Sequence, residues 1–168
     1  MPFYEDFTDF KNGQRNGWEN GPHLPYGEIR LENGSYFWSG DLKVPSKPSI
    51  PIQPSLIKTF PLSEEEQLDR YIISFFYRVH RLQAGEATEL PVAVCTDGYE
   101  HLGVLAWLTE KTPIDQWIPV KDKSSWFRSS TVLYIGTGRG LVNNLHRKID
   151  ITNILVTRIT PALEIARR

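Results

Sequence analysis

An alternating stretch near the middle of the chain constrains the fold more than any other feature. In residues 71–81, apolar and aromatic side chains occupy every second position from Tyr71 to Val79, and the positions between them become polar towards Arg78 and His80. A period of two is typical of a β-strand with one face in a core and the other towards solvent or a groove. Similar runs recur along the chain and predict an all-β, two-sheet antiparallel β-sandwich.

The expected strands are separated by clear turn signals. Asn33-Gly34 and Asp97-Gly98 each lie between two apolar runs and favour tight hairpins, because their residues tolerate positive φ. The four prolines of 44–54 predict an extended surface loop rather than an interior strand. The strands are expected at 4–10, 27–32, 35–39, 55–61, 69–82, 91–96, 101–110, 116–121, 126–128, 131–136 and 149–160.

The length of the chain fits one domain, and its charge and hydropathy disfavour nucleic-acid binding and a membrane span. At 168 residues a single core is the default, so we expect one domain over 1–168 with a frayed tail at 161–168. The formal net charge of -1 gives no field that would attract nucleic acid. No apolar stretch approaches the ~20 residues that span a bilayer. Without a cleavable signal peptide, the chain is expected to be cytosolic, exported by another route, or a module of a larger protein.

Catalytic motifs are missing from the sequence. It has no Gly-x-Ser-x-Gly elbow, His-Glu-x-x-His, Cys-x-x-Cys or Walker loop. Its carboxylates fall in turns and charged clusters, and no pair is marked out as the two acids of a glycosidase would be. The histidines do not have zinc-like spacing. We therefore expect no enzyme.

Both ends of the chain resemble a known family. Residues 6–13 read Asp-Phe-Thr-Asp-Phe-Lys-Asn-Gly, with Asn-Gly-Trp at 16–18, and residues 134–140 read Tyr-Ile-Gly-Thr-Gly-Arg-Gly, with Ile-Asp-Ile-Thr-Asn-Ile-Leu-Val-Thr-Arg-Ile at 149–159. The pattern resembles the jelly-roll carbohydrate-binding modules of the galactose-binding-domain-like superfamily. The resemblance implies a jelly roll with paired first and last strands, the glycine-rich run 136–140 as a turn before the closing strand, and a glycan or polysaccharide as partner.

Sugar binding requires an exposed aromatic face, which stacks on the C–H side of a pyranose, and planar polar groups for its hydroxyls. Tyr36 and Trp38, in the hairpin after Asn33-Gly34, are the first candidates. Trp107, Arg78 and His80 can line a sheet face, where arginine offers a rigid fork of donors. Packing inside the sandwich or ordinary surface exposure is the competing interpretation for each. The tryptophans expected to be packing residues are Trp18, Trp117 and Trp126.

The resemblance also implies a structural calcium ion between the first and last strands, held by hard oxygen ligands. Asp150 stands where an acidic ligand would lie, with Asp6 or Asp9 as partners. The sequence departs from the family at Thr152, in place of a second aspartate, and at Lys11, in place of a glutamate. The alternative role for Asp150 and Asn153 is to satisfy backbone groups near the start of the strand.

These features predict a non-catalytic carbohydrate-binding module. The alternative is a protein–protein interaction or toxin-associated domain on the same sandwich, because exposed Trp and Tyr side chains also anchor protein interfaces. The segment 82–91 receives no role from the sequence.

Overall fold

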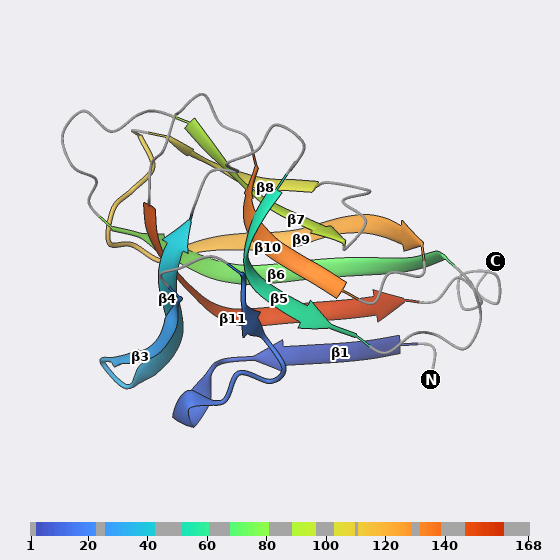
Figure 1. The fold of residues 1–168 in the computed structure, drawn as a ribbon, viewed down its shortest axis with the longest axis horizontal. Coiled ribbons are helices and arrows are strands. Elements are labelled where there is room, and N and C mark those ends of the chain that lie inside the picture. Colours follow the sequence, from blue (N-terminus) through green and yellow to red (C-terminus); the bar gives the residue numbers. More distant parts are fainter. Residues whose placement is uncertain are drawn as a thin grey trace.

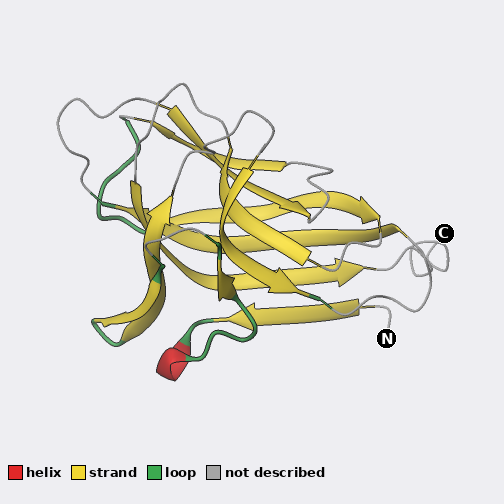
Figure 2. Ribbon diagram, viewed as in Figure 1, coloured by secondary structure: helices red, strands yellow, loops and turns green. Residues whose placement is uncertain are grey.

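The computed structural model describes residues 3–22, 26–42, 52–60, 68–80, 89–96, 103–109, 111–128, 132–138 and 147–159. Strands make up most of these residues, and a short 3-10 helix, η1 (Lys11–Gly13), lies close to the end of the first strand (Figure 2). The described residues include no helix with the length and hydropathy needed to cross a bilayer. The prediction of an all-β fold is confirmed.

The strands form two antiparallel sheets that face each other. The first sheet has the order β3-β4-β11-β6-β9, with β1 also on β11, and the second has the order β2-β5-β10-β7-β8 (Figure 1). The bounds are β1 Phe3–Thr8, β2 Glu19–Asn20, β3 Glu28–Glu32, β4 Ser35–Leu42, β5 Ile52–Thr59, β6 Leu68–Val79, β7 Glu89–Thr96, β8 Gly103–Thr109, β9 Ile118–Arg128, β10 Val132–Gly138 and β11 Arg147–Ile159.

The core lies between the sheets and follows the alternation of the sequence. On β6, Ile73, Phe75, Tyr77 and Val79 are buried, whereas Phe76 points to the opposite face and is exposed. The second sheet contributes Leu56, Leu108, Leu133 and Ile135, and β11 contributes Ile149, Ile151, Ile154 and Val156. Burying such residues away from water provides most of the driving force for folding.

Strand β11 is the central strand of the first sheet. One of its edges pairs with β6, and its other edge pairs with β4 over 147–151 and then with β1 over 154–159. The register against β6 shifts between Thr152 and Leu155, where Asn153 adopts a φ of 50°. The pairing of β1 with β11 confirms the expectation that the first and last strands are neighbours.

The Pro-rich loop ends earlier than expected, because β5 begins at Ile52. Residues 52–54 were expected in that loop, but they belong to β5, which lies between β2 and β10. Pro54 is tolerated because it lies at a bulge: Ile135 faces Leu56 and Gly136 faces Pro54, which leaves Ser55 as the extra residue. Gly136 and Gly138 likewise belong to β10 rather than to a turn.

Most other sequence expectations agree with the strand bounds. Asn33 and Gly34, with φ of 50° and 78°, form the predicted hairpin turn between β3 and β4. The expected strands 116–121 and 126–128 are one continuous strand, β9, and the sequence did not indicate β2 or η1. The Asp97-Gly98 turn, the tail at 161–168, the 44–51 part of the loop and residues 82–88 lie outside the described residues.

Candidate ligand-binding groove

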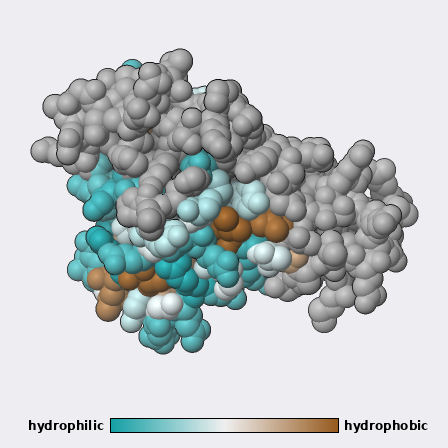
Figure 3. Space-filling model, in the orientation of Figure 1, coloured by the Kyte–Doolittle hydropathy of each residue, from teal (hydrophilic) through white to brown (hydrophobic). Residues whose placement is uncertain are grey.

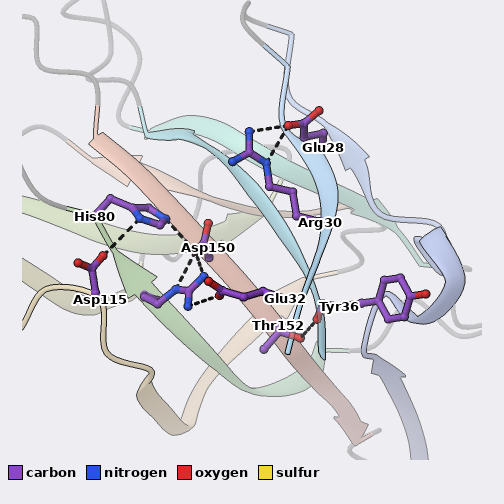
Figure 4. A network of polar contacts seen from close by, with 9 residues as sticks. Glu28, Arg30, Glu32, Tyr36, His80, Asp115, Asp150 and Thr152 are labelled. Atoms are coloured by element: carbon purple, nitrogen blue, oxygen red, sulfur yellow. Dashed lines mark hydrogen bonds and ion pairs between the residues drawn. The ribbon is translucent and has the colours of Figure 1, made fainter. Parts of the chain in front are cut away.

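The outward face of the first sheet carries a cluster of charged side chains. Arg78 of β6 donates from Nε to Asp150 Oδ2 over 2.8 Å, and its Nη1 lies 2.6 Å from Glu32 Oε2 of β3. His80 Nε2 lies 2.8 Å from the same Asp150 oxygen, and its Nδ1 lies 3.4 Å from Asp115 Oδ1. Figure 4 shows Glu32, Asp150, His80 and Asp115 converging from separate segments. We call these five residues the Arg78 network.

Two aromatic rings enclose the guanidinium group of Arg78. Its Cζ lies 5.0 Å from the centre of the Phe37 ring and 4.7 Å from that of Trp117. The two rings meet edge to face, with centroids 5.7 Å apart. Burial lowers the pKa of Arg78, but the hydrogen bonds and charges of Asp150 and Glu32 outweigh it, so the pKa is raised overall. Arg78 is therefore a permanent cation that lies against the Trp117 ring.

Asp150 is the buried centre of this network. Its side chain is fully buried, and its Oδ2 takes both the Arg78 and the His80 contacts. Its Oδ1 has no hydrogen-bond partner among the residues that the structure describes. An isolated buried carboxylate would be costly, so the Arg78 cation and the hydrogen-bonding contact with His80 are needed to keep Asp150 in place.

A groove of about 540 Å³ opens beside the network. It lies at the edge of β11 where the pairing with β4 ends and the pairing with β1 begins. The bulge at Thr152 and Asn153 lies between these two pairings and contributes to the floor of the groove. Thr152 Oγ1 donates to the carbonyl of Tyr36 over 2.8 Å and ties β4 to this bulge. The described lining residues are Asp9, Lys11, Gly34, Ser35, Tyr36, Phe76, Trp117, Thr152 and Asn153.

The groove combines aromatic surface with polar groups. Trp117 and Phe76 are 36% and 38% exposed, so ring surface is available to a ligand. Ser35, Asn153, Asp9 and Lys11 supply hydroxyl, amide, carboxylate and ammonium groups around them. Among the described residues drawn in Figure 3, most are hydrophilic, with separate apolar patches such as the one over β3. The groove can therefore hold a ligand that has both an apolar face and hydroxyl groups.

Of the predicted ligand residues, only Tyr36 lines the groove. Figure 4 shows its ring pointing away from Glu32 and Asp150. Trp38 is 1% exposed, and its Nε1 donates to Asn20 Oδ1 over 2.9 Å. The prediction that Trp38 stacks on a ligand is therefore wrong, because its ring is part of the core.

The other three predicted ligand residues lie elsewhere. Arg78 and His80 belong to the Arg78 network, where their polar contacts are to carboxylates of the protein. Trp107 is 53% exposed and lies on β8 of the second sheet, opposite Pro91 of β7. The structure therefore does not bring the predicted residues into one site.

The predicted calcium ligands are also separated. Asp6 faces Val156 in the β1–β11 pairing, six residues along β11 from Asp150, which corresponds to roughly 20 Å of extended strand. Asp6 forms an ion pair with Lys58, Asp150 forms one with Arg78, and the exposed Asp9 accepts the backbone N–H of Lys11. Within the described part of the chain, no three acidic, His or Cys side chains are grouped as metal ligands. The structure therefore does not group Asp150 with Asp6 or Asp9 as ligands, and calcium binding stays a prediction.

Sequence reasoning missed the two most exposed rings of the groove. Phe76 lies on the outward face of β6, and this alternation was a usable signal. Trp117 was expected to be a packing residue, because its surroundings in the sequence do not reveal its contacts with Phe37 and Arg78. Asn153 was considered only as a residue that satisfies backbone groups, because its place in the groove depends on the bulge in β11.

Comparisons with known proteins bear on the fold. No protein-family model matches the chain, and no curated protein matches it. The xylan-binding CBM22-1 domain of Xyn10C from Paenibacillus barcinonensis is similar in structure, with a TM-score of 0.50 and 11% identity over 91% of this chain and 92% of that one.

Two further solved structures are less similar. The K3 cleaved adhesin domain of Lys-gingipain from Porphyromonas gingivalis w83 has a TM-score of 0.47 and 15% identity over 92% of this chain and 98% of that one. A CBM28 module specific for non-crystalline cellulose has a TM-score of 0.35 and 14% identity over 91% and 88%. The similarity to the CBM22-1 domain and the two antiparallel sheets together show that this chain has the jelly-roll β-sandwich fold of carbohydrate-binding modules.

Proposed function

We propose that this chain is a non-catalytic module that binds a glycan in the groove beside the Arg78 network. The observation that carries the proposal is the pair of exposed rings, Trp117 and Phe76, in a groove that also presents Ser35 and Asn153. A pyranose has an apolar C–H face and a polar rim of hydroxyls, which match ring surfaces and hydrogen-bonding groups respectively. The similarity in fold to a xylan-binding domain supports the proposal.

Pre-organisation favours binding at Trp117. Its ring contacts the Arg78 guanidinium and forms an edge-to-face pair with Phe37, so little side-chain freedom remains to be lost when a ligand stacks. A ring that is already fixed costs less entropy on binding than a mobile one. Arg78 is thus proposed as a positioning residue rather than as a ligand contact.

The groove is unsuited to glycoside hydrolysis. Glycosidases use two carboxyl groups about 5–10 Å apart. Asp9 is the sole carboxylate among the described lining residues, and the buried Asp150 already interacts with Arg78 and His80. We therefore propose binding without bond cleavage, and incubation with a bound polysaccharide should release no reducing sugar.

The proposal is tested with a glycan array followed by titration calorimetry on the best ligand. Trp117→Ala and Phe76→Ala should each weaken binding about tenfold or more, which is the loss expected when one stacking ring is removed. Trp107→Ala is the matched control, because Trp107 is also an exposed tryptophan but lies on the other sheet.

Two outcomes would contradict the groove as the site. If Trp107→Ala abolishes binding and Trp117→Ala does not, the ligand binds the second sheet instead. If diverse glycans all fail to bind the folded wild-type protein, the alternative of a protein-interaction domain is favoured, and the exposed rings are then anchors for a protein partner.

A further inference from the structure

A second charged pair lies between the two sheets, where it joins β5 of the second sheet to β1 of the first. Lys58 of β5 points into the protein, and its Nζ lies 2.6 Å from Asp6 Oδ2 of β1. The two side chains are only 8% and 5% exposed. The same ammonium donates to the backbone carbonyl of Asn16 and lies 5.3 Å from the centre of the Phe60 ring. Lysine is almost never buried so deeply unless it is paired.

The loop between β1 and β2 is folded around this ammonium. The side-chain amide of Asn16 donates to Asp6 Oδ1 over 3.3 Å, to the Phe7 carbonyl over 3.1 Å and to Thr8 Oγ1 over 3.0 Å. Asn16 and Gly17 have φ of 47° and 81°. A Cβ added to Gly17 would lie 3.4 Å from Lys58 Cε, so the loop backbone rests on the lysine side chain.

The oxygens around Lys58 are those that a hard cation prefers. A carboxylate and a backbone carbonyl are typical calcium ligands, and Asp6 was one of the residues expected to bind calcium. In the structure the cation at Asp6 is the side chain of a residue on the opposite sheet. A bound cation and a buried ammonium would both neutralise Asp6 and join the first strand to the loop.

We infer that the Lys58 ammonium is a built-in structural cation that replaces a bound metal ion at Asp6 and Asn16. The loop that it organises also carries Asp9 and Lys11, which line the groove. The inference concerns the stability of the first strand and loop, and it does not depend on the proposed glycan binding.

The inference predicts how the melting temperature responds to cations. The wild-type Tm should be the same in excess EGTA and in millimolar calcium chloride. Lys58→Ala should lower the Tm by roughly 10 °C or more, because it removes the cation that lies 2.6 Å from a buried carboxylate. Propylammonium chloride supplies the atoms that Lys58→Ala removes, so it should reverse part of the decrease in Tm. Sodium chloride at equal ionic strength should not.

Two variants separate the charge of Lys58 from its volume. Lys58→Met fills the space without a charge, so its Tm should fall and should not respond to propylammonium. The double variant Asp6→Asn with Lys58→Ala removes the anion, so the propylammonium response should disappear.

Either of two results would overturn the inference. The first is a Lys58→Met Tm within about 2 °C of wild type, because a buried ion pair that loses one partner should cost far more than that. The second is a fall in wild-type Tm on adding EGTA that Asp6→Asn abolishes, because a metal ion would then be the cation at Asp6. Both results remain measurable if Lys58→Ala fails to fold.

Discussion

Arg78 combines three physical roles in one side chain. Nε and Nη2 lie within hydrogen-bond distance of Asp150 Oδ2, Nη1 pairs with Glu32, and the flat guanidinium surface packs between Phe37 and Trp117. Lysine could supply the charge, but its compact ammonium lacks the planar fork and the stacking surface. The geometry at this position therefore requires arginine specifically.

Replacing Arg78 should affect both stability and binding. Arg78→Met leaves the buried Asp150 without its main counterion and should reduce the free energy of unfolding by about 3–5 kcal/mol, as measured by urea denaturation. The control is Arg30→Met, because Arg30 forms an exposed pair with Glu28 and should cost less than about 1 kcal/mol. Equal losses in the two variants would show that Arg78 contributes no more than a surface charge.

Arg78→Lys tests the positioning of Trp117 directly. It keeps the charge beside Asp150 but removes the stacked plane, so we expect glycan affinity to fall further than stability does. Calorimetric titration and urea unfolding of the same variant separate the two effects. Wild-type affinity in a folded Arg78→Lys protein would contradict the positioning role.

Tyr77 should make the free energy of unfolding depend on pH in alkaline solution. Burial raises the pKa of Tyr77 from its ordinary value of 10.0, so the unfolded chain releases this proton before the folded protein does. Stability contributed by Tyr77 is thus present below pH 10 and is lost as pH rises through the raised pKa. Tyr77→Phe should remove this contribution, so its curve of unfolding free energy against pH should be flatter than that of wild type by up to about 1.4 kcal/mol per pH unit. Parallel curves for the two proteins between about pH 9 and 11 would contradict this expectation.

At the scale of single strands, alternation predicted most of the first sheet. The two faces of 71–81 were assigned correctly where the structure describes side chains, because the core imposes its period of two directly on the sequence. Strand β2 has two residues, which is too short for any periodicity to be detected. The start of β5 was missed because a proline at a bulge looks the same in the sequence as a proline in a loop.

The site was predicted less well than the strands, because the exposure of a tryptophan is set by contacts that are distant in the sequence. Trp38 is covered by Gly27 and bonded to Asn20, both from a segment that precedes it. Trp117 is held by Phe37 and Arg78, which are distant in sequence. Burial of a large ring depends on these long-range contacts, and a single sequence does not reveal them.

The packing of β3 and β4 around Trp38 depends on glycine. A Cβ at Gly27 would lie 2.2 Å from the Trp38 ring, and one at Gly40 would lie 2.4 Å from it. Gly27→Ala should therefore lower the free energy of unfolding by about 2–3 kcal/mol through overpacking. Gly34→Ala is the control, because nothing lies within 4 Å of its Cβ and only its φ of +78° opposes a side chain; it should cost about 1 kcal/mol. Urea denaturation of both variants makes the comparison, and equal costs would show that the Trp38 ring can move aside.

At the scale of the whole molecule, the groove is a product of topology. It forms because β4 and β1 share one edge of β11 and leave the bulge of that strand between them. The lining residues therefore come from the beginning, the middle and the end of the chain. No local motif can encode such a site, which explains why the resemblance at the two ends predicted the fold but not the groove.

The central position of β11 also has a consequence for protein synthesis. Its partners β1, β4 and β6 are all translated before it, and in Figure 1 β11 runs between β6 and β1. Long-range pairing of this kind is slow, because the ends of long loops must meet before any contact is gained. Ribosome-bound chains that stop before residue 147 should therefore be cut readily by protease within β1, whereas chains with β11 outside the exit tunnel should be protected there. Until β11 is translated, the nascent chain would have unpaired strand edges that can aggregate. Chaperones or rapid translation of the last strand would then be needed to prevent this aggregation.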